Sequence, residues 1–243
     1  MKRLNTKKIE MFAGDPFTPY LAAFPAPARK FVPKWFREFP LFFGNKGKYS
    51  WLGPKGNNST FKACMPLFDT MTSGYMIPVP MDIYVLRDEA GIARFQWRDG
   101  GETPMVGEHD LDQIPDQMVP DEYERIPYKF ASHYHITTPP GYSLLFVHPL
   151  NRMDLPFHSI SGFVDTDKYN AVVNFPFFLK KGFEGLIEAG TPMLQAIPVK
   201  REPWEMGLDK VYDEEKAMKT NGPLFSKMFR GYRDHFWSKK DYS

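Results

Sequence analysis

Short apolar runs separated by glycine, proline and aspartate fill most of the chain between residues 61 and 199, and this pattern predicts β-strands. The runs span about 5–8 residues, which is the length of a typical strand. Strands are expected within residues 61–69, 74–88, 91–97, 128–138, 141–150, 157–165 and 171–178, followed by one that ends in Gln195–Pro198. Because Asp88–Gly91 is a turn sequence between two such runs, residues 81–97 are expected to form a β-hairpin.

The N-terminal 60 residues follow a different pattern. Between residues 16 and 40 proline recurs roughly every fourth position, which is too dense for a long helix. One helical turn is expected at Pro33–Glu38, since proline suits the first position of a helix. Six aromatic residues lie between residues 31 and 43, and an apolar surface of that size is rarely left exposed. We therefore expect this arm to wrap over its own domain, with donation to a neighbouring subunit as the alternative.

The C-terminal residues change to helical spacing. A helix is expected over Asp209–Asn221, because Gly222 and Pro223 form a helix stop signal. A second helix would place Leu224, Met228, Phe229, Tyr232 and Phe236 on one apolar face. Residues 99–127 are acidic and proline-rich, which indicates a surface loop with at most one short strand. The chain thus divides into an arm (1–60), a β domain (61–202) and a helical extension (203–243).

The composition supports a mainly β protein. The chain has 23 prolines and 16% aromatic residues, which suits short strands joined by tight turns. A single cysteine, Cys64, excludes a disulfide within the chain. The net charge of +2, with both signs interspersed, offers no specific signal for nucleic acid or a membrane surface. The N-terminus lacks the apolar run of a signal peptide, so a soluble cytoplasmic protein is expected.

Two aspartates form the first candidate site. Asp165 and Asp167 follow Gly162-Phe163-Val164 and are two positions apart, so they would share a face of an extended strand. Two neighbouring carboxylates can split their pKa values, hold a divalent metal or orient a water molecule as general base. Asp-Thr-Asp-Lys is also a sequence that β-turns prefer, and this alternative gives the aspartates a structural role.

Histidines form a second candidate site. His133 and His135 are two positions apart on an expected strand, where two imidazoles on one face can bind a transition metal. A jelly-roll or cupin-like metalloenzyme is one hypothesis from this pair. The following residues, ITTPP, lack the glutamate that the cupin pattern needs, and isolated His-x-His pairs are commonly polar surface or core residues.

The segment Lys200–Trp204 is a third candidate. A cation pair beside an aromatic ring can bind phosphate or stack on a base. The alternative, which we prefer, is a charged strand end with Trp204 packed under the terminal helix.

Several of these segments resemble a known family. GFVDTDKY, VVNFPF and IEAGTPMLQAIPV look like the central motifs of the dUTPase and dCTP-deaminase superfamily, and TTPPGYSLLFVHPLNR and GYMIPVPMDIYV resemble its earlier ones, in the same order. The resemblance covers residues 74–87 and 136–199. It implies a β-clip fold, a nucleotide ligand that brings Mg²⁺, and homotrimers with active sites shared between subunits. The chain also resembles proteins of marine phages, which implies the cytoplasm of a host cell.

The resemblance also implies roles for individual residues. Asp165 would be the water-activating carboxylate and Tyr169 the ring that lies against the deoxyribose. The remaining ligand-binding positions implied by the motifs are Asp82, Arg152 and Gln195.

The chain departs from the family pattern where phosphates would bind. Lys168 separates Asp167 from the tyrosine, and Met153 and Asp154 replace the serines after the arginine. Thr191-Pro192 replaces a charged pair, and the C-terminal residues lack a glycine-rich tail. Because triphosphates need converging N–H groups and cations, these changes favour a binding or assembly role without a complete triphosphatase site. The alternatives are a dUTP-type pyrophosphohydrolase with Asp165 as general base and the metalloenzyme that uses His133 and His135.

Overall fold

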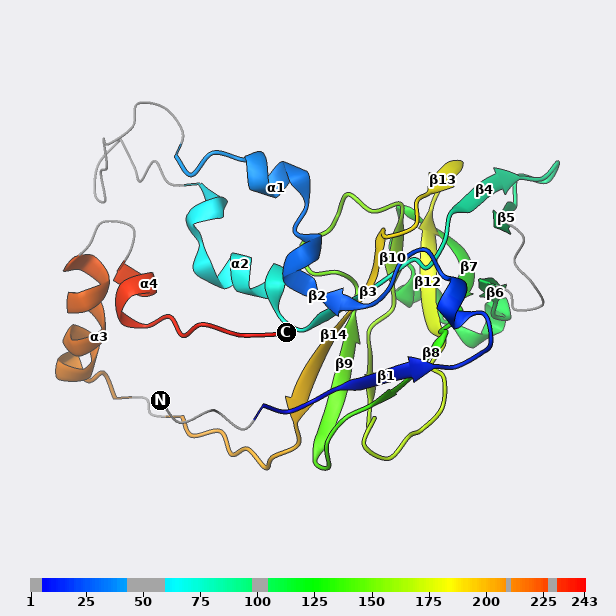
Figure 1. Cartoon of the computed structure of the whole chain (residues 1–243). Coiled ribbons are helices and arrows are strands. Elements are labelled where there is room, and N and C mark those ends of the chain that lie inside the picture. Colours follow the sequence, from blue (N-terminus) through cyan, green and yellow to red (C-terminus); the bar gives the residue numbers. More distant parts are fainter. Residues whose placement is uncertain (1–5, 43–59, 98–104, 209–210, 227–230) are drawn as a thin grey trace. The chain divides into compact units, whose positions relative to one another are not determined.

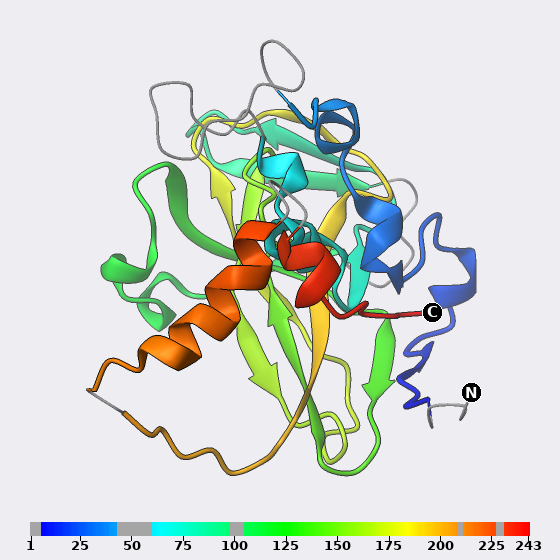
Figure 2. The same cartoon turned by 90° about the vertical axis from the view of Figure 1, so that its left-hand side faces the viewer.

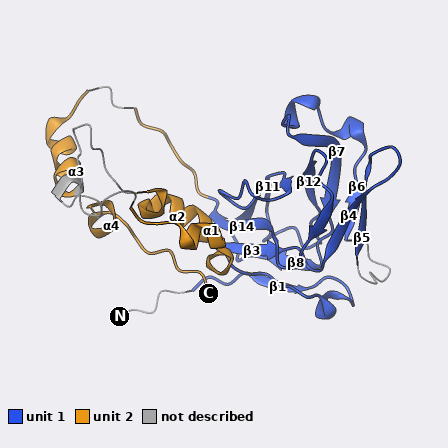
Figure 3. Cartoon of the chain, turned by 90° about the horizontal axis from the view of Figure 1, so that it is seen from above, with its two compact units in different colours: residues 1–27, 74–201 blue, residues 28–73, 202–243 orange. Residues whose placement is uncertain are grey.

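A computed structural model describes the chain except for residues 1–5, 43–59, 98–104, 209–210 and 227–230 (Figure 1). The chain forms two compact units, which Figure 3 shows in different colours. Residues 1–27 and 74–201 make up the first, the β unit, and residues 28–73 and 202–243 make up the second, the helical unit. The predicted arm, residues 1–60, is therefore divided between the two units.

The described residues of the β unit form four antiparallel sheets, so the predicted mainly β architecture is confirmed. The largest has the order β11 (Gly162–Val164), β9 (Tyr142–Val147), β14 (Pro192–Lys200), β3 (Tyr75–Pro78) and β2 (Ala26–Pro27). The second has the order β10 (Phe157–Ser159), β12 (Phe175–Lys180), β7 (Tyr123–Phe130) and β6 (Val106–Glu108). The others are β13 (Gly185–Ile187), β4 (Ile83–Arg87) and β5 (Ala93–Trp97), and the pair β1 (Glu10–Ala13) and β8 (Tyr134–Thr137).

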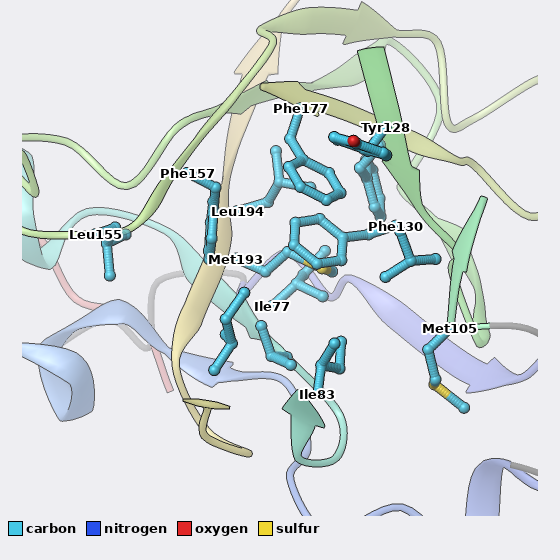
Figure 4. Close-up of a cluster of buried hydrophobic side chains, with 14 of the residues drawn as sticks. Ile77, Ile83, Met105, Tyr128, Phe130, Leu155, Phe157, Phe177, Met193 and Leu194 are labelled. Carbon is cyan, nitrogen blue, oxygen red and sulfur yellow. The ribbon is translucent and has the colours of Figure 1, made fainter. Parts of the chain in front are cut away.

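These sheets share one aromatic core. Phe130 on β7 and Phe177 on β12 stack with ring centroids 3.9 Å apart, and Figure 4 shows their rings side by side above Ile77 and Ile83. Phe146 on β9 lies 5.2 Å from Phe175 on β12, which joins the largest sheet to the second one. Burial of these large side chains is the main favourable term for the fold.

The predicted hairpin is confirmed, and the first predicted strand is wrong. β4 pairs with β5 through a turn in which the Gly91 N–H donates to the Asp88 carbonyl at 2.8 Å. Residues 61–69 form instead the 3₁₀ turn η3 (Phe61–Ala63) and the helix α2 (Met65–Thr72). Local chemistry explains the difference: the Thr60 hydroxyl accepts from the Lys62 N–H, and Pro66 lies in the first helical turn, where its missing N–H costs nothing.

The loop predicted over residues 99–127 is only partly confirmed, because two strands begin within it. Among the residues described there, β6 is the short strand, η4 (Leu111–Gln113) and η5 (Asp116–Met118) are single turns, and β7 already begins at Tyr123. The predicted strand over residues 171–178 starts later, at Phe175.

The predicted arm contributes to the β unit through its first half. β1 pairs with β8 and β2 pairs with β3, and between them the turn η1 (Thr18–Tyr20) precedes Leu21, which is 5% exposed in the core. The first half of the arm thus packs on the β unit of the same chain.

The helical unit contains the turn predicted at Pro33–Glu38. It is the helix α1 (Lys34–Glu38), which follows η2 (Ala28–Phe31). Phe36 is buried and lies 6.3 Å from the ring of Phe68 on α2, whereas Trp35 and Phe39 stay about half exposed. Burial of the arm's aromatic residues is therefore only partial.

The C-terminal helix does not stop at Asn221. α3 (Glu214–Ser226) continues through Gly222 and Pro223 and is followed by α4 (Gly231–His235). Pro223 therefore lies inside α3, where it lacks the N–H that would donate to the carbonyl of residue 219. Met228 and Phe229 of the predicted apolar face lie outside the described residues. Among the residues that the structure describes, no helix is both long and apolar enough to cross a membrane.

Candidate functional site

The acidic pair lies where three strands of the largest sheet meet. β9 is flanked by β11 and β14, with Leu144 opposite Val164 and Tyr142 opposite Lys200. The start of β9 therefore lies beside the ends of β11 and β14. Asp165 directly follows β11, and Arg201 directly follows β14.

Asp165–Lys168 form a turn, which confirms the turn interpretation of Asp-Thr-Asp-Lys. The other interpretation, in which Asp165 and Asp167 share a face of an extended strand, is wrong. The Asp165 carbonyl accepts from the backbone N–H groups of Lys168 at 2.9 Å and Tyr169 at 2.8 Å. Thr166 is 2% exposed, and its hydroxyl lies 2.8 Å from that of Thr138. These bonds join the turn to the Thr138–Gly141 connection that leads into β9.

The Arg201 guanidinium holds both carboxylates. Its Nη1 lies 3.2 Å from Asp165 Oδ1 and 2.7 Å from Ser143 Oγ, and its Nη2 donates to Asp167 Oδ2. Ser143, which is fully buried, donates its hydroxyl to Asp165 Oδ1 at 2.6 Å. The Gly141 N–H donates to Asp167 Oδ2 at 2.8 Å. We call this group of Gly141, Ser143, Asp165, Asp167 and Arg201 the acidic clasp.

The electrostatics of the acidic clasp differ between its two carboxylates. The hydrogen bond from Arg201 lowers the pKa of Asp167 to about 2, and the same bond raises the pKa of Arg201. The Asp167 side chain is only 6% exposed, whereas that of Asp165 is 50% exposed. Asp167 is therefore a permanently charged structural partner of Arg201. Asp165 is the carboxylate that a ligand could reach.

Buried Asp167 Oδ1 has no hydrogen-bond partner among the described residues. A buried carboxylate oxygen without a donor is costly, and here the adjacent Arg201 and Gly141 bonds to Oδ2 compensate for it.

Tyr169 ends this turn, since its backbone N–H donates to the Asp165 carbonyl. Its side chain is 49% exposed, and that of Phe163 on β11 is 56% exposed. Asp165, Asp167 and Tyr169 are therefore the predicted site residues that one turn brings together, and the half-exposed Asp165 and Tyr169 side chains are open to a ligand.

Gln195 and Arg152 lie at the other end of β9. Gln195 pairs with Val147, four positions along the strand from Ser143, which is a separation of about 13 Å at the usual rise per residue. The Gln195 side chain is buried and accepts from the Leu150 N–H at 3.1 Å. Arg152 makes a two-pronged ion pair with Asp154, with bonds of 2.8 and 2.9 Å. These two residues therefore do not join Asp165 within one chain.

A buried histidine pair completes that end of β9. His148 Nδ1 accepts from the Ser159 N–H, so its Nε2 carries the proton and donates to the Arg152 carbonyl at 3.0 Å. Burial lowers the pKa of His148 to about 4, and its ring stacks on that of His158 at 4.4 Å. Both nitrogens of His148 are thus used within the fold.

Asp82 lies apart from both groups. Its carboxylate accepts from the Ala189 N–H at 2.8 Å and so joins the β3–β4 connection to the turn between β13 and β14.

The two histidines of the metal hypothesis have separate surroundings. His133 is 2% exposed; its Nδ1 lies 2.7 Å from Asp15 Oδ2 and its Nε2 lies 3.2 Å from Met105 Sδ. His135 stacks on Phe12 with ring centroids 5.1 Å apart. Across the described ranges, no group of three or more His, Cys, Asp or Glu side chains is arranged to hold a metal ion.

Sequence reasoning missed the partners of the acidic pair. Arg201 was considered as a phosphate ligand, and Ser143 was not considered. The sequence does contain a hint of these partners. If residues 142–147 pair antiparallel with residues 195–200, Arg201 lies beside the turn that follows β11. Trp204 is 88% exposed, so its predicted packing under the terminal helix is wrong.

No protein-family model matches the chain, and a search of curated proteins gives no match.

Proposed function

We propose that the chain has a binding or assembly role, on a dUTPase-like β domain, and that it forms homo-oligomers through the segment after β14. The main observation in favour of this assembly is that residues 202–208 expose large apolar side chains. This segment forms neither helix nor strand (Figures 1 and 2). Trp204 is 88% exposed, Met206 89% and Leu208 73%. Val211 and Tyr212 continue this exposure at 78% and 79%.

The amount of exposed apolar surface supports a protein partner. These five side chains together expose several hundred Å², since an aromatic side chain alone presents roughly 150–250 Å². A standard interface buries about 800 Å² per partner, and patches larger than a few hundred Å² on a monomer commonly mark interaction sites.

The spacing of these residues supports a second copy of the chain as the partner. Trp204, Met206 and Leu208 recur at every second position, which is the pattern of a strand with one apolar face. Extended segments of this kind pair with open sheet edges. Among the described strands, β11 and β2 are the two edge strands of the largest sheet, and β11 offers such an edge.

The acidic clasp supports binding rather than hydrolysis. A general base needs a carboxylate oxygen that is free to accept a proton from water, and the fold already uses one of the two Asp165 oxygens, because Ser143 and Arg201 both donate to Oδ1. Arg152 and Gln195, which would face the phosphates, are engaged with Asp154 and the Leu150 N–H.

Light scattering coupled to size exclusion tests the assembly role. We expect the full chain to elute as a multiple of its 28.2 kDa mass, with three copies if it assembles as the family does. The double variant Trp204→Ser and Met206→Ser should shift the chain toward the monomer. Met153→Ser, which changes a side chain 75% exposed on the β unit, is the matched control and should keep the oligomer. A wild-type monomer at about 100 µM, well above the range of a stable complex, would contradict the proposal.

A second candidate function is a dUTP-type pyrophosphohydrolase, in which Mg²⁺ arrives with the triphosphate. The half-exposed Asp165 and Tyr169 on one turn favour it. Because Arg152 and Gln195 lie at the other end of β9, this function would require those residues from a neighbouring subunit.

A further inference from the structure

Positive charge is concentrated in one part of the chain, which the net charge of +2 conceals. Residues 28–63 contain eight lysines and arginines and a single acidic residue, Glu38. Five of the eight basic residues are among the described residues, and all five belong to the helical unit. A local excess of this kind produces a positive field even when the whole chain is nearly neutral.

Exposed aromatic rings accompany these cations. On and just after α1, Trp35 is 48% and Phe39 45% exposed, and Phe61 in η3 is 79% exposed. They alternate along the chain with Lys34, which is 78% exposed, and with the exposed Arg37.

Hydrogen bonds bring the two segments together. The Thr60 N–H donates to the Leu41 carbonyl at 2.9 Å, and the Thr60 hydroxyl donates to the Pro40 carbonyl at 2.5 Å. The Lys62 ammonium donates to the Arg37 carbonyl. Phe61 and Lys62 therefore lie beside the C-terminal end of α1. We call the resulting surface the basic–aromatic patch: Lys34, Trp35, Arg37, Phe39, Phe61 and Lys62.

We propose that the basic–aromatic patch binds single-stranded nucleic acid. Cations that follow a phosphate backbone, together with aromatic rings on which bases stack, are the combination that binds single strands without sequence preference. Glu38 is the nearby acid, and it lies 3.7 Å from Lys34. Among the described residues, no carboxylate pairs with Arg37 or Lys62.

An anionic membrane is the less favoured partner. Interfacial helices are longer and separate an apolar face from a basic one. α1 has only five residues, which is too short for such a helix. The exposed rings outnumber the aliphatic side chains, which suits stacking better than insertion into lipid.

Fluorescence anisotropy of a fluorescein-labelled dT20 oligonucleotide with the full chain tests the proposal. We expect saturable binding at 50 mM salt, with a log–log salt slope of about −2 if three cations contact phosphates of a single strand. Phe61→Ala should weaken binding at least about fivefold, since it removes one stacking platform. Arg37→Glu should weaken it further and make the salt slope shallower.

Two control variants match these changes on the β unit. Lys181→Glu makes the same change in charge at an exposed position, and Met153→Ala removes a side chain that is 75% exposed. Both should bind the oligonucleotide like the wild type. Circular dichroism of each variant establishes that it is folded.

Three results would overturn the proposal. The first is the absence of an anisotropy change with up to about 50 µM protein, a weaker interaction than non-specific binding normally shows. The second is an equal loss in Lys181→Glu, which would assign binding to the net charge. The third is binding to phosphatidylserine vesicles without binding to the oligonucleotide, which would identify the patch as a membrane surface.

Discussion

Replacing Ser143 with alanine should show how strongly the acidic clasp stabilises the fold. The hydroxyl is fully buried; it donates to Asp165 at 2.6 Å and accepts from Arg201 at 2.7 Å. A hydrogen bond to a charged group contributes about 1.5–3 kcal/mol. Arg201 and Asp165 are 31% and 50% exposed, so water can replace part of what they lose. We therefore expect Ser143→Ala to lower the free energy of unfolding by about 2 kcal/mol, which is less than the roughly 3–6 kcal/mol of two such bonds between fully buried groups.

Urea unfolding of the wild type and the variant measures this difference at pH 7. The corresponding fall in melting temperature is about 4–8 °C, at roughly 2–4 °C per kcal/mol for a domain of this size. Ser159→Ala is the matched control, because Ser159 is also fully buried but donates to a neutral acceptor, the Met193 carbonyl, at 2.7 Å. It should cost about 1 kcal/mol.

A variant that combines Ser143→Ala with Asp165→Asn isolates what the charge of Asp165 adds to its hydrogen bond with Ser143. The two substitutions should be non-additive by about 1 kcal/mol, because Asp165→Asn removes the charge that strengthens the hydrogen bond that Ser143→Ala removes. The reasoning is refuted if Ser143→Ala costs no more than Ser159→Ala, or if the double variant is strictly additive.

Two further predictions concern charge and packing. Because Arg201 lowers the pKa of Asp167 to about 2, Asp167 contributes stability that is present above its ordinary pKa near 4 and is lost as the pH falls through about 2. Unfolding measured between pH 2 and 7 should therefore be less pH-dependent in Asp167→Asn; identical pH profiles would count against this. Phe177→Ala should lower the free energy of unfolding by about 3–5 kcal/mol, because the Phe177 ring is fully buried against Phe130. Phe163 is half exposed, so Phe163→Ala should change the free energy of unfolding by no more than about 0.5 kcal/mol. Equal losses for the two variants in thermal unfolding would contradict the assignment of the core.

The strand pattern was predictable from the sequence because it depends on local chemistry. Asp88–Gly91 specifies a turn between two alternating runs, and Pro33 specifies the start of α1. Residues 61–69 were mistaken for a strand because their apolar run is short. A run this short does not distinguish a helix from a strand by its periodicity, and the Thr60 cap of η3 and Pro66 in the first turn of α2 both favour helical structure.

The candidate site was only half predictable. Asp165 and Asp167 are adjacent in sequence, and a turn was one of the two interpretations. Arg201 follows β14 and is more than thirty residues beyond Asp165 and Asp167 in the sequence. Its contact with the two aspartates depends on the register between β14 and β9, which no local pattern specifies. The basic–aromatic patch was missed for another reason: net charge averages over two units with different charge balances.

The central claim is that the acidic clasp holds the fold and does not catalyse hydrolysis. Pyrophosphate release from dUTP in the presence of Mg²⁺ tests it most directly, with the full chain and its Asp165→Asn variant side by side. We predict no release by the wild type above the rate of the variant, together with a lower unfolding free energy for the variant. Release by the wild type that disappears in a folded Asp165→Asn protein would contradict the account.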